Sequence, residues 1–482
     1  MWDYDELAKE WGAHRAQVLR TDYNQSLAAT IELSLTSPTF CKLGPEAREL
    51  LGVMAFFPQG IDKNNLDWLF PTISDVKNIF DKFCVLSLTY RSDSFLTMLA
   101  PIRDYLRLQD PTSSPLLRET MDRYLSRLSV DVHPDRPGFG EARWITLEDV
   151  NVEHLLDVFA SVGTDSDDIW NGCINFMRHL YWHKQRHTML GPNIERLPDD
   201  HRSKSECLFE LSRLFSSIGN HTEQKRLLTH ALNLERGRED EGWIARILSY
   251  LSNANRTLGL YKEGMQQSRE ALGIFKRLGD TRGQANCMVD MAQLLHEEKK
   301  LDAAEETAAS GIDLFPENGH ELYVCQSRRA LGNIYRSKGE RANAVRHLEA
   351  ALDIASAFNW RYQLFWTYLS LSLLSFDQGQ IGDAHDHLEQ AKSYAGEGTN
   401  VYHLGQAIFL QARISYREHR LKDATSDALR AVEIFEKLGA TKSLGECRAL
   451  LREIGAKSRP PSDESEFTLS EFSGRSVTTY TR

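Results

Sequence analysis

The sequence predicts an all-α protein in which about six helix pairs stack into a superhelix, preceded by a small domain that contains a β-hairpin. Two observations predict this fold. Small and apolar residues recur at a period of forty residues from about Arg202 to Gly455. The first 131 residues lack this period and show helical segments followed by two short β-type segments. The repeat therefore covers about half of the 482-residue chain.

Two columns of small residues carry the repeat. The first column is Ser212, Ser252, Ala292, Gly332, Ser372 and Ala412. The second column is Ala231, Ala271, Gly311, Ala351, Ala391 and Ala431. Small side chains let two helix backbones approach closely, which predicts two antiparallel helices in each unit. A single helix pair cannot bury its apolar stripe alone, so the units are expected to stack.

Glycines mark the turn inside four of the six units. They are Gly219, Gly259, Gly339 and Gly379. Glycine is favoured at this position because it adopts the left-handed backbone conformation that ends a helix without steric cost. After the sixth unit, Thr441–Ile454 is expected to form one more amphipathic helix that caps the array.

One unit carries the pattern most completely: Leu331–Ala355 reads LGNIYRSKGERANAVRHLEAALDIA. Its small and aromatic positions resemble the tetratricopeptide repeat, at Leu331, Gly332, Tyr335, Ala344 and Ala351, and Pro316 closes the preceding unit as the family's proline does. The resemblance implies a right-handed superhelix of about six 40-residue pairs whose concave groove is lined by the first helix of each unit. The period exceeds the family's usual 34 residues, so longer helices are expected. Gln224 and Gly264 depart from the family by replacing alanine.

The N-terminal part is expected to place several helices before a hairpin. The helices are expected over Asp3–Leu19, Asn24–Leu35, a segment that begins at Pro45, Asp62 to about Phe70, Ser74–Phe83 and a segment that begins at Pro101. The two strands are expected over Val85–Tyr90 and Phe95–Leu99, with a turn at Ser92 and Asp93. Helices followed by such a hairpin predict a small winged-helix domain.

Two runs in this region, LGPEARELLGVMAFFPQGI and LSLTYRSDSFLTMLAPIRDYL, resemble the winged-helix end of an NB-ARC module in fungal relatives of NOD-like receptors. The segments NVEHLLDVFASV and FMRHLYWHKQRH are similar to the middle region of fungal NB-ARC–tetratricopeptide proteins. The resemblance implies the regulatory or sensor portion of a signal-transducing protein of the STAND type. In that family the winged helix follows a nucleotide-binding core and precedes the repeats.

Two departures separate this chain from the nucleotide-binding members of that family. The sequence contains no GxxxxGK[ST] motif, so the backbone cradle and lysine that hold phosphates are missing. The family's Met-His-Asp motif falls at Met98, Leu99 and Ala100, and Leu99 cannot donate the hydrogen bond that the family's histidine makes to ADP. No cofactor is therefore assigned. The alternative is a fragment of an ADP/ATP-dependent switch whose nucleotide-binding core lies upstream of Met1.

Composition and charge narrow the class of partner. Hydrophobic residues make up 41% and charged residues 26% of the chain, which is typical of a globular protein. The net charge is −11, and the first 130 residues alone carry 17 acidic and 14 basic residues. Nucleic-acid-binding proteins usually concentrate positive charge, so no nucleic acid is expected. A winged-helix transcriptional regulator with a repeat sensor remains an alternative.

Candidate chemical sites are few. His179, His183 and His187 stand four residues apart, which would place them on one stripe of a helix, but Arg178, Lys184 and Arg186 crowd the same segment and would repel a metal ion. The seven cysteines form no CxxC pair, and no GxSxG motif is present. We therefore assign no catalytic, cofactor-binding or metal-binding residue, and we expect a protein that is not an enzyme.

The concave groove is the remaining candidate surface. Repeat register places these residues on it: Arg246, Asn253, Arg256, Asp290, Gln293, Arg329, Asn333 and Arg336. Arg329 and Asn333, one helical turn apart, resemble part of the clamp by which some tetratricopeptide domains bind a peptide C-terminal carboxylate, for which arginine offers bidentate pairing. Asp290 would repel such a carboxylate. The cluster Phe358, Trp360, Tyr362, Phe365 and Trp366 is expected to fill the joint between units four and five.

These observations together predict the following organisation: a winged-helix domain over 1–131, a linker over 132–147, a helical bridge over 148–200, the repeat array with its cap helix over 201–456 and a disordered tail over 457–482. The expected function is a non-enzymatic scaffold that binds a protein or peptide in the repeat groove, with self-association as a further expectation. The acidic N-terminus MWDYDELAKEW does not resemble a signal peptide, and no apolar stretch reaches the ~20 residues that span a bilayer. A cytoplasmic protein is therefore expected.

Overall fold

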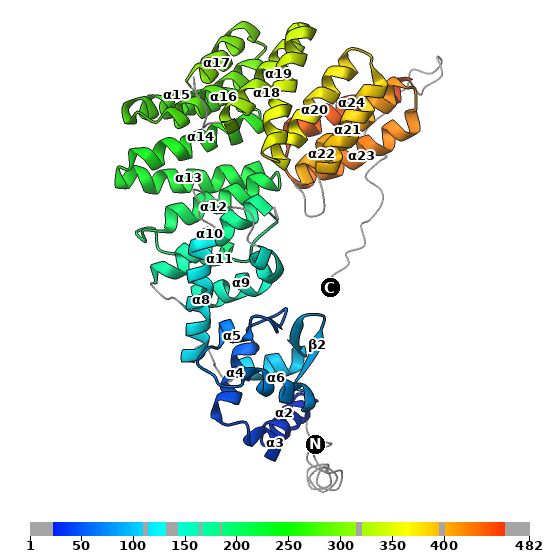
Figure 1. Cartoon of the computed structure of the whole chain (residues 1–482). Coiled ribbons are helices and arrows are strands. Elements are labelled where there is room, and N and C mark those ends of the chain that lie inside the picture. Colours follow the sequence, from blue (N-terminus) through cyan, green and yellow to red (C-terminus); the bar gives the residue numbers. More distant parts are fainter. Residues whose placement is uncertain are drawn as a thin grey trace. The chain divides into compact units, whose positions relative to one another are not determined.

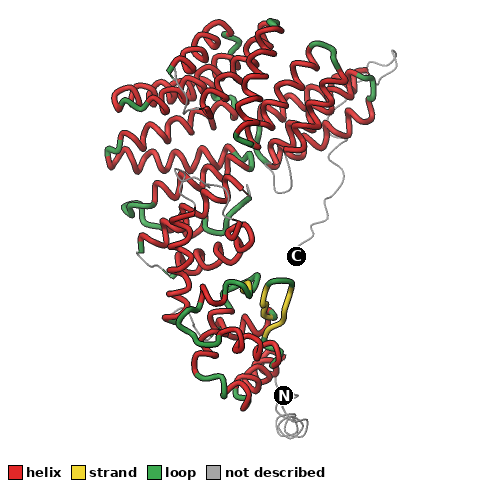
Figure 2. Tube along the Cα trace, viewed as in Figure 1, coloured by secondary structure: helices red, strands yellow, loops and turns green. Residues whose placement is uncertain are grey.

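The computed structural model describes residues 23–108, 114–131, 143–162, 166–183, 186–314, 321–394 and 401–457. The described residues are predominantly helical, and their strands are confined to the N-terminal part (Figure 2). The chain divides into two compact units: the first consists chiefly of 1–255 and 262–287, and the second chiefly of 256–261, 288–397 and 401–482. The expected helix at Asp3–Leu19, Pro316 and the tail after Lys457 lie outside the described residues.

Short helices and a three-stranded antiparallel sheet form the N-terminal part of the first unit (Figure 1). The helices are α2 (Tyr23–Leu35), α3 (Pro38–Cys41), α4 (Pro45–Met54), α5 (Leu66–Leu69), α6 (Val76–Val85) and α7 (Ala100–Arg107). The strands are β1 (Ile61–Asp62), β2 (Thr89–Ser92) and β3 (Phe95–Met98), in the order β1-β3-β2. Thr89 lies opposite Met98, and Ile61 lies opposite Leu96.

The predicted hairpin exists, but its first strand begins later than expected. Val85 ends α6 and does not start a strand, because the buried stripe of Ile79, Phe80 and Phe83 continues the helix to that point. Ser87, with a φ of 57°, then turns the chain toward β2. Pro45 stands in the first turn of α4, as the sequence predicted, where proline's fixed φ favours the start of a helix.

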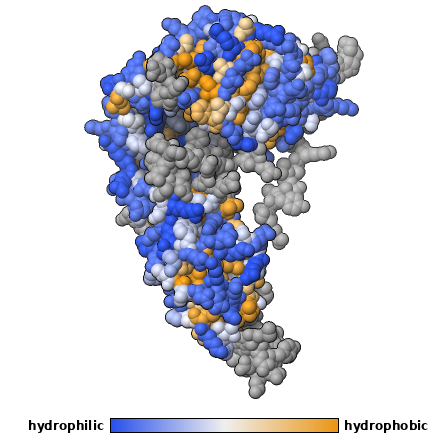
Figure 3. All heavy atoms as spheres, in the orientation of Figure 1, coloured by the Kyte–Doolittle hydropathy of each residue, from blue (hydrophilic) through white to orange (hydrophobic). Residues whose placement is uncertain are grey.

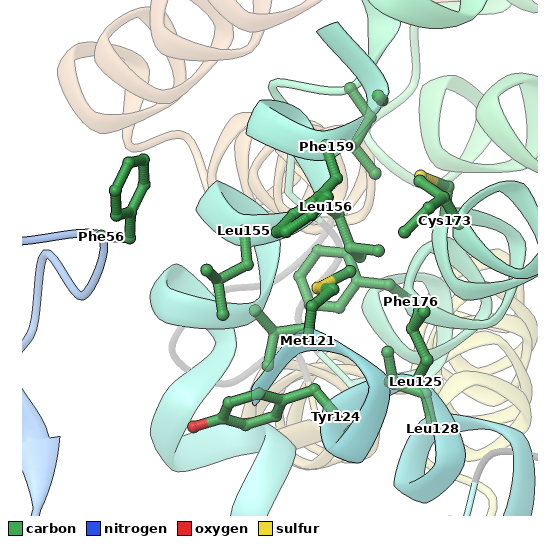
Figure 4. Packing of buried hydrophobic residues seen from close by; sticks show 14 of the residues in the cluster. Phe56, Met121, Tyr124, Leu125, Leu128, Leu155, Leu156, Phe159, Cys173 and Phe176 are labelled. Carbon is green, nitrogen blue, oxygen red and sulfur yellow. The ribbon is translucent and has the colours of Figure 1, made fainter. Parts of the chain in front are cut away.

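Three longer helices and one short helix follow in the first unit: α8 (Pro115–Asp131), α9 (Arg143–Ser161), α10 (Asp167–His183) and the short α11 (Gly191–Arg196). Figure 4 shows their apolar side chains meeting in one cluster, which includes Met121, Tyr124, Leu125 and Leu128 from α8, Leu155, Leu156 and Phe159 from α9, and Cys173 and Phe176 from α10. Gly172 makes the close approach possible, because a Cβ there would lie 2.3 Å from Cδ2 of Leu125.

Six helix pairs and a final helix follow, which confirms the predicted tetratricopeptide-type array (Figure 1). The first helices of the pairs are α12 (Lys204–Ser217), α14 (Glu241–Thr257), α16 (Thr281–Glu297), α18 (Glu321–Lys338), α20 (Arg361–Asp377) and α22 (Val401–Arg417). The second helices are α13 (His221–Arg238), α15 (Tyr261–Leu278), α17 (Leu301–Asp313), α19 (Arg341–Ala357), α21 (Ile381–Tyr394) and α23 (Leu421–Lys437). The final helix is α24 (Thr441–Lys457).

The small residues lie where the two helices of a pair cross. Ser212, Ser252, Ala292, Ser372 and Ala412 are all 0% exposed. In the fourth pair the position is Gly332, where a Cβ would lie 2.5 Å from Cγ of Leu348. Close packing of the two helices therefore requires a small residue at this position of every pair, as the sequence predicted.

Left-handed residues end the first helix of every pair. The four predicted glycines, Gly219, Gly259, Gly339 and Gly379, have φ values of 74° to 87°. In the remaining two pairs the same position is Lys299, with a φ of 63°, and His419, with a φ of 61°. A side chain with a Cβ is strained in this conformation, so both turns are maintained by the packing of their helices.

Candidate protein-binding face

The first helices of the second unit form one continuous surface, which we call the first-helix face: the C-terminal part of α16 with α18, α20, α22 and α24. This face is concave. Nζ of Lys442 on α24 lies 2.6 Å from Oε2 of Glu297 on α16, although three helix pairs lie between the two residues in the chain. A flat row of helices could not bring residues 145 positions apart into contact. The sequence period gives no sign of this ion pair.

The ion pair is partly buried, since the side chains of Lys442 and Glu297 are 35% and 23% exposed. Burial opposes both charges, but the opposite charge of the partner outweighs it: the pKa of Glu297 lies below its usual value and the pKa of Lys442 lies above its usual value. Burial also lowers the pKa of the neighbouring His296 to about 4, so this histidine is neutral at pH 7.

Polar side chains connect each first helix to the next one along the chain. Nδ2 of Asn333 donates to Oγ of Ser370 at 3.1 Å, and Nε2 of Gln406 donates to Oγ of Ser443 at 2.8 Å. Nε2 of His296 and Oγ of Ser337 share a hydrogen bond of 2.7 Å. Of the residues that register placed on the groove, Asn333 thus contacts the next first helix.

Some of the predicted groove residues contact a neighbouring first helix, and others are exposed or buried within the array. Arg336 forms an ion pair with Asp377 of the next first helix, and Asn333 is engaged by Ser370. In the first unit, the exposed Arg246 lies with its guanidinium 5.0 Å from the ring centre of Trp243. The other members are partly or fully buried: Asn253 and Gln293 are intermediate in exposure, and Asp290 is only 6% exposed.

Arg256 and Arg329 differ from the other candidates. Nε of each is buried and has no hydrogen-bond partner among the residues that the structure describes, which is also true of Nε of Arg336, but Arg336 has its ion pair with Asp377. Neither guanidinium takes part in an ion pair or a side-chain hydrogen bond with those residues. Burial lowers the pKa of Arg329, and the like charge of Arg256 lowers it further. The two guanidinium groups therefore have no ion-pair partner among the described residues, although the charge of Arg256 contributes to the lowered pKa of Glu297.

Aromatic residues lie on α20 and in the turn that precedes it. Phe365 is 1% exposed, as expected for a joint between repeats, and His403 stacks on it at 4.6 Å between ring centres. Tyr362 and Phe358 were also expected to be buried in the joint, but their side chains are exposed, at 43% and 49%. Figure 3 shows hydrophobic residues gathered on the part of the surface where α18 and α20 lie in Figure 1.

The three histidines do not form the predicted helical stripe. α10 ends at His183, and His187 lies in an irregular segment after it, where its ring meets Phe215 at 5.7 Å. His179 is 2% exposed within the core of the first unit. Among the described residues, no group of three or more His, Cys, Asp or Glu side chains could hold a metal ion. Within the same residues, no helix is both long enough and apolar enough to cross a bilayer.

Comparisons with known proteins agree with the fold. Residues 324–356 match the family model of the tetratricopeptide repeat. The crystal structure of a Signal Transduction ATPase with Numerous Domains (STAND) protein with a tetratricopeptide repeat sensor, from Pyrococcus horikoshii, is similar over 95% of this chain and 71% of that chain, with 14% identity and a TM-score of 0.55. No curated protein matches the sequence.

Two further solved structures are similar to this chain with lower TM-scores. A Rap protein complexed with competence and sporulation factor matches 70% of this chain and 98% of its own, with 14% identity and a TM-score of 0.47. The apo form of the quorum sensor NprR from B. thuringiensis matches 70% of this chain and 97% of its own, with 13% identity and a TM-score of 0.40. At these identities the likeness concerns the fold alone.

Proposed function

We propose that this chain is a non-enzymatic scaffold that binds a protein or peptide on the first-helix face, and that it serves as the regulatory or sensor portion of a cytoplasmic STAND-type signalling protein. The observation that carries the proposal is the concave first-helix face, on which Tyr362 is 43% exposed and Nε of Arg329 is buried without a hydrogen-bond partner among the described residues. Exposed aromatic side chains and arginines are the residue types that most often dominate binding energy at protein interfaces.

The N-terminal part supports the finer proposal of a winged-helix domain. Its elements follow the order α4, β1, α5, α6, β2, β3, and β1 pairs with the second strand of the hairpin. A helix, a short strand, two helices and a hairpin joined by that strand are the parts of a winged helix. We propose that this region corresponds to the winged-helix end of an NB-ARC module, as in fungal NOD-like receptors, and transmits ligand binding from the repeats.

The charges on this region favour a packing role over DNA binding. Lys77 on α6 pairs with Asp67 at 2.5 Å, and Arg91 on β2 pairs with Asp81 at 2.6 Å. Both basic residues are thus paired with neighbouring acids, whereas a DNA-binding module uses its basic residues to contact phosphate.

Position-specific cross-linking tests the scaffold proposal. A photoreactive amino acid at Tyr362 would report on the first-helix face, and the same amino acid at the exposed Glu349 of α19 would report on the second helices. Irradiation in cells that produce the protein is expected to capture a discrete partner from position 362 and not from position 349. Capture at 349 alone, or equal capture of the same proteins at both positions, would reject the first-helix face as the binding surface.

A nucleotide-dependent switch is the second candidate, because the similar STAND protein is an ATPase of which this chain matches 71%. Leu99, at the position of the family's histidine, is 52% exposed and has no polar group for a nucleotide. A reading frame that continues upstream of Met1 through a GxxxxGK[ST] motif would support this candidate. Hydrolysis of ATP by the purified 482-residue chain would contradict the non-enzymatic proposal.

A further inference from the structure

Side-chain contacts connect the first helices of the second unit into a closed series. Each first helix from α16 to α22 contacts the next one, through the pairs His296 and Ser337, Asn333 and Ser370, Phe376 and Arg417, and Gln406 and Ser443. Lys442 on α24 then contacts Glu297 on α16, where the series began. The five helices therefore form a ring of contacts, and the concave first-helix face is the inner side of that ring.

The ion pair of Lys442 and Glu297, which we call the clasp, differs from the other links in this ring. Consecutive first helices also share apolar clusters, which unite Ala292 with Leu331, Cys325 with Leu364, Leu369 with Leu410, and Ile408 with Leu450. Among the described residues, no hydrophobic cluster includes side chains of both α16 and α24. The clasp is therefore the link that can open while the helix pairs stay stacked.

Several groups on the first-helix face are covered while the ring is closed. Arg336 pairs with Asp377, and its side chain is only 19% exposed. Phe376 is 7% exposed, and the guanidinium of Arg413 on the next first helix lies 4.8 Å from its ring centre. A partner gains access to groups covered in this way only when the first helices or their side chains move apart.

The clasp has the properties of a contact that opens reversibly. Its two side chains are 35% and 23% exposed, and ion pairs at such positions contribute little to stability and weaken when salt screens them. Removing a pair of this kind shifts the balance between a closed and an open form by about fivefold.

We propose that the clasp keeps the first-helix face in a closed state, and that a partner protein or peptide binds this face after the clasp has opened. The contact between α24 and α16 is thus autoinhibitory. This inference rests on the proposed function and concerns the regulation of the same face. Neutralising either side chain of the clasp favours the open form and therefore favours binding.

Cross-linking with a carbodiimide tests whether the clasp forms in solution. This reagent joins a carboxylate to an amine that contacts it, and Lys338 with Glu305 provides an internal standard at the same Nζ–Oε2 distance of 2.6 Å. Mass spectrometry of the digested full chain is expected to find both links at low salt. At raised salt the link between Lys442 and Glu297 should decrease relative to the standard, because an apolar cluster holds α17 and α18 together.

Capture by a photoreactive amino acid at Tyr362 tests whether the clasp restrains binding. In cells, Glu297→Gln and Lys442→Met, which each remove one charge of the clasp, should raise the yield of the captured partner about fivefold. Glu436→Gln is the matched control. It removes an ion pair between α23 and α24, with Arg448 at 2.7 Å, and should leave the yield unchanged because that pair does not involve α16.

Absence of the link between Lys442 and Glu297 at low salt, while the standard forms, would overturn the inference. A capture yield from both clasp variants that equals the wild-type yield or falls below it would also overturn it. This failure is distinguishable from failure of the proposed function, since equal capture at position 362 from all four proteins would leave the scaffold proposal intact. Capture from none of the four would reject the scaffold proposal, and the clasp would then have no binding face to regulate.

Discussion

Replacing Gly332 by alanine should destabilise the second unit, although alanine is the better helix former. An added Cβ would lie 2.5 Å from Cγ of Leu348, and the carbonyl oxygen of Ala344 lies 3.4 Å away on the same side. Carbon atoms in contact need about 3.5–4.0 Å, so the fully buried Leu348 would have to move by about 1 Å. Overpacking of this kind costs about 1–3 kcal/mol, and helix propensity returns about 1 kcal/mol. The expected net loss is about 1 kcal/mol.

A double-mutant cycle tests whether the clash with Leu348 causes the loss of stability. In a Leu348→Ala background the clash is absent, as in the third pair, where the crossing is made by Ala292 and Ala308. Gly332→Ala should then stabilise the protein by about 1 kcal/mol, so the coupling free energy should be about 2 kcal/mol. Urea unfolding measures all four proteins. Gly273→Ala, at a helical position with no atom within 4 Å of the added Cβ, is the control and should stabilise. Equal effects of Gly332→Ala in both backgrounds would refute the close-packing account.

Three further predictions concern the turns and the first-helix face. Lys299→Gly and His419→Gly should each stabilise the protein by about 1 kcal/mol in urea unfolding, because they remove a left-handed residue that has a Cβ; a loss of stability would contradict the strain. Burial lowers the pKa of His296 to about 4. Between pH 6.5 and pH 4 only the unfolded chain therefore takes up the proton, so the free energy of unfolding should fall as the pH drops through this range. His296→Gln should reduce that fall by about 3 kcal/mol, and a pH profile that the substitution leaves unchanged would contradict the lowered pKa. In a double-mutant cycle followed by urea unfolding, Glu297→Gln and Lys442→Met should show a favourable coupling free energy of about 1 kcal/mol. If the effects of the two substitutions simply add, the ion pair does not stabilise the protein.

The repeat array could be predicted from the sequence because its determinants are local and recur. The crossing at Gly332 and Leu348 involves residues sixteen positions apart, and the position of Gly332 carries a small residue in every unit. Glycine in the αL turn is similarly a local requirement. The turns at Lys299 and His419 show the limit of that signal, because neighbouring helices there hold a less suitable residue in the same conformation.

The residues that form the first-helix face could not be predicted in the same way, because their contacts depend on how several helix pairs stack. A local sequence pattern does not contain this information. The contact between Glu297 and Lys442 arises from the accumulated curvature of several helix pairs. Register placed Asn333 and Arg329 on the same surface, but only the neighbouring helix decides that Asn333 is engaged by Ser370 while Arg329 has no partner among the described residues. The strand β1 was missed because two residues are too few to show alternation.

The binding constant of the captured partner for two variants tests the central claim most directly. Tyr362→Ala alters the half-exposed ring on the first-helix face, and Glu349→Ala alters an exposed residue on the second helix of the fourth pair. An aromatic residue at the centre of an interface contributes about 2 kcal/mol or more, so Tyr362→Ala should raise Kd more than tenfold and Glu349→Ala should leave it unchanged. An unchanged Kd for Tyr362→Ala together with a raised Kd for Glu349→Ala would contradict the proposed binding face.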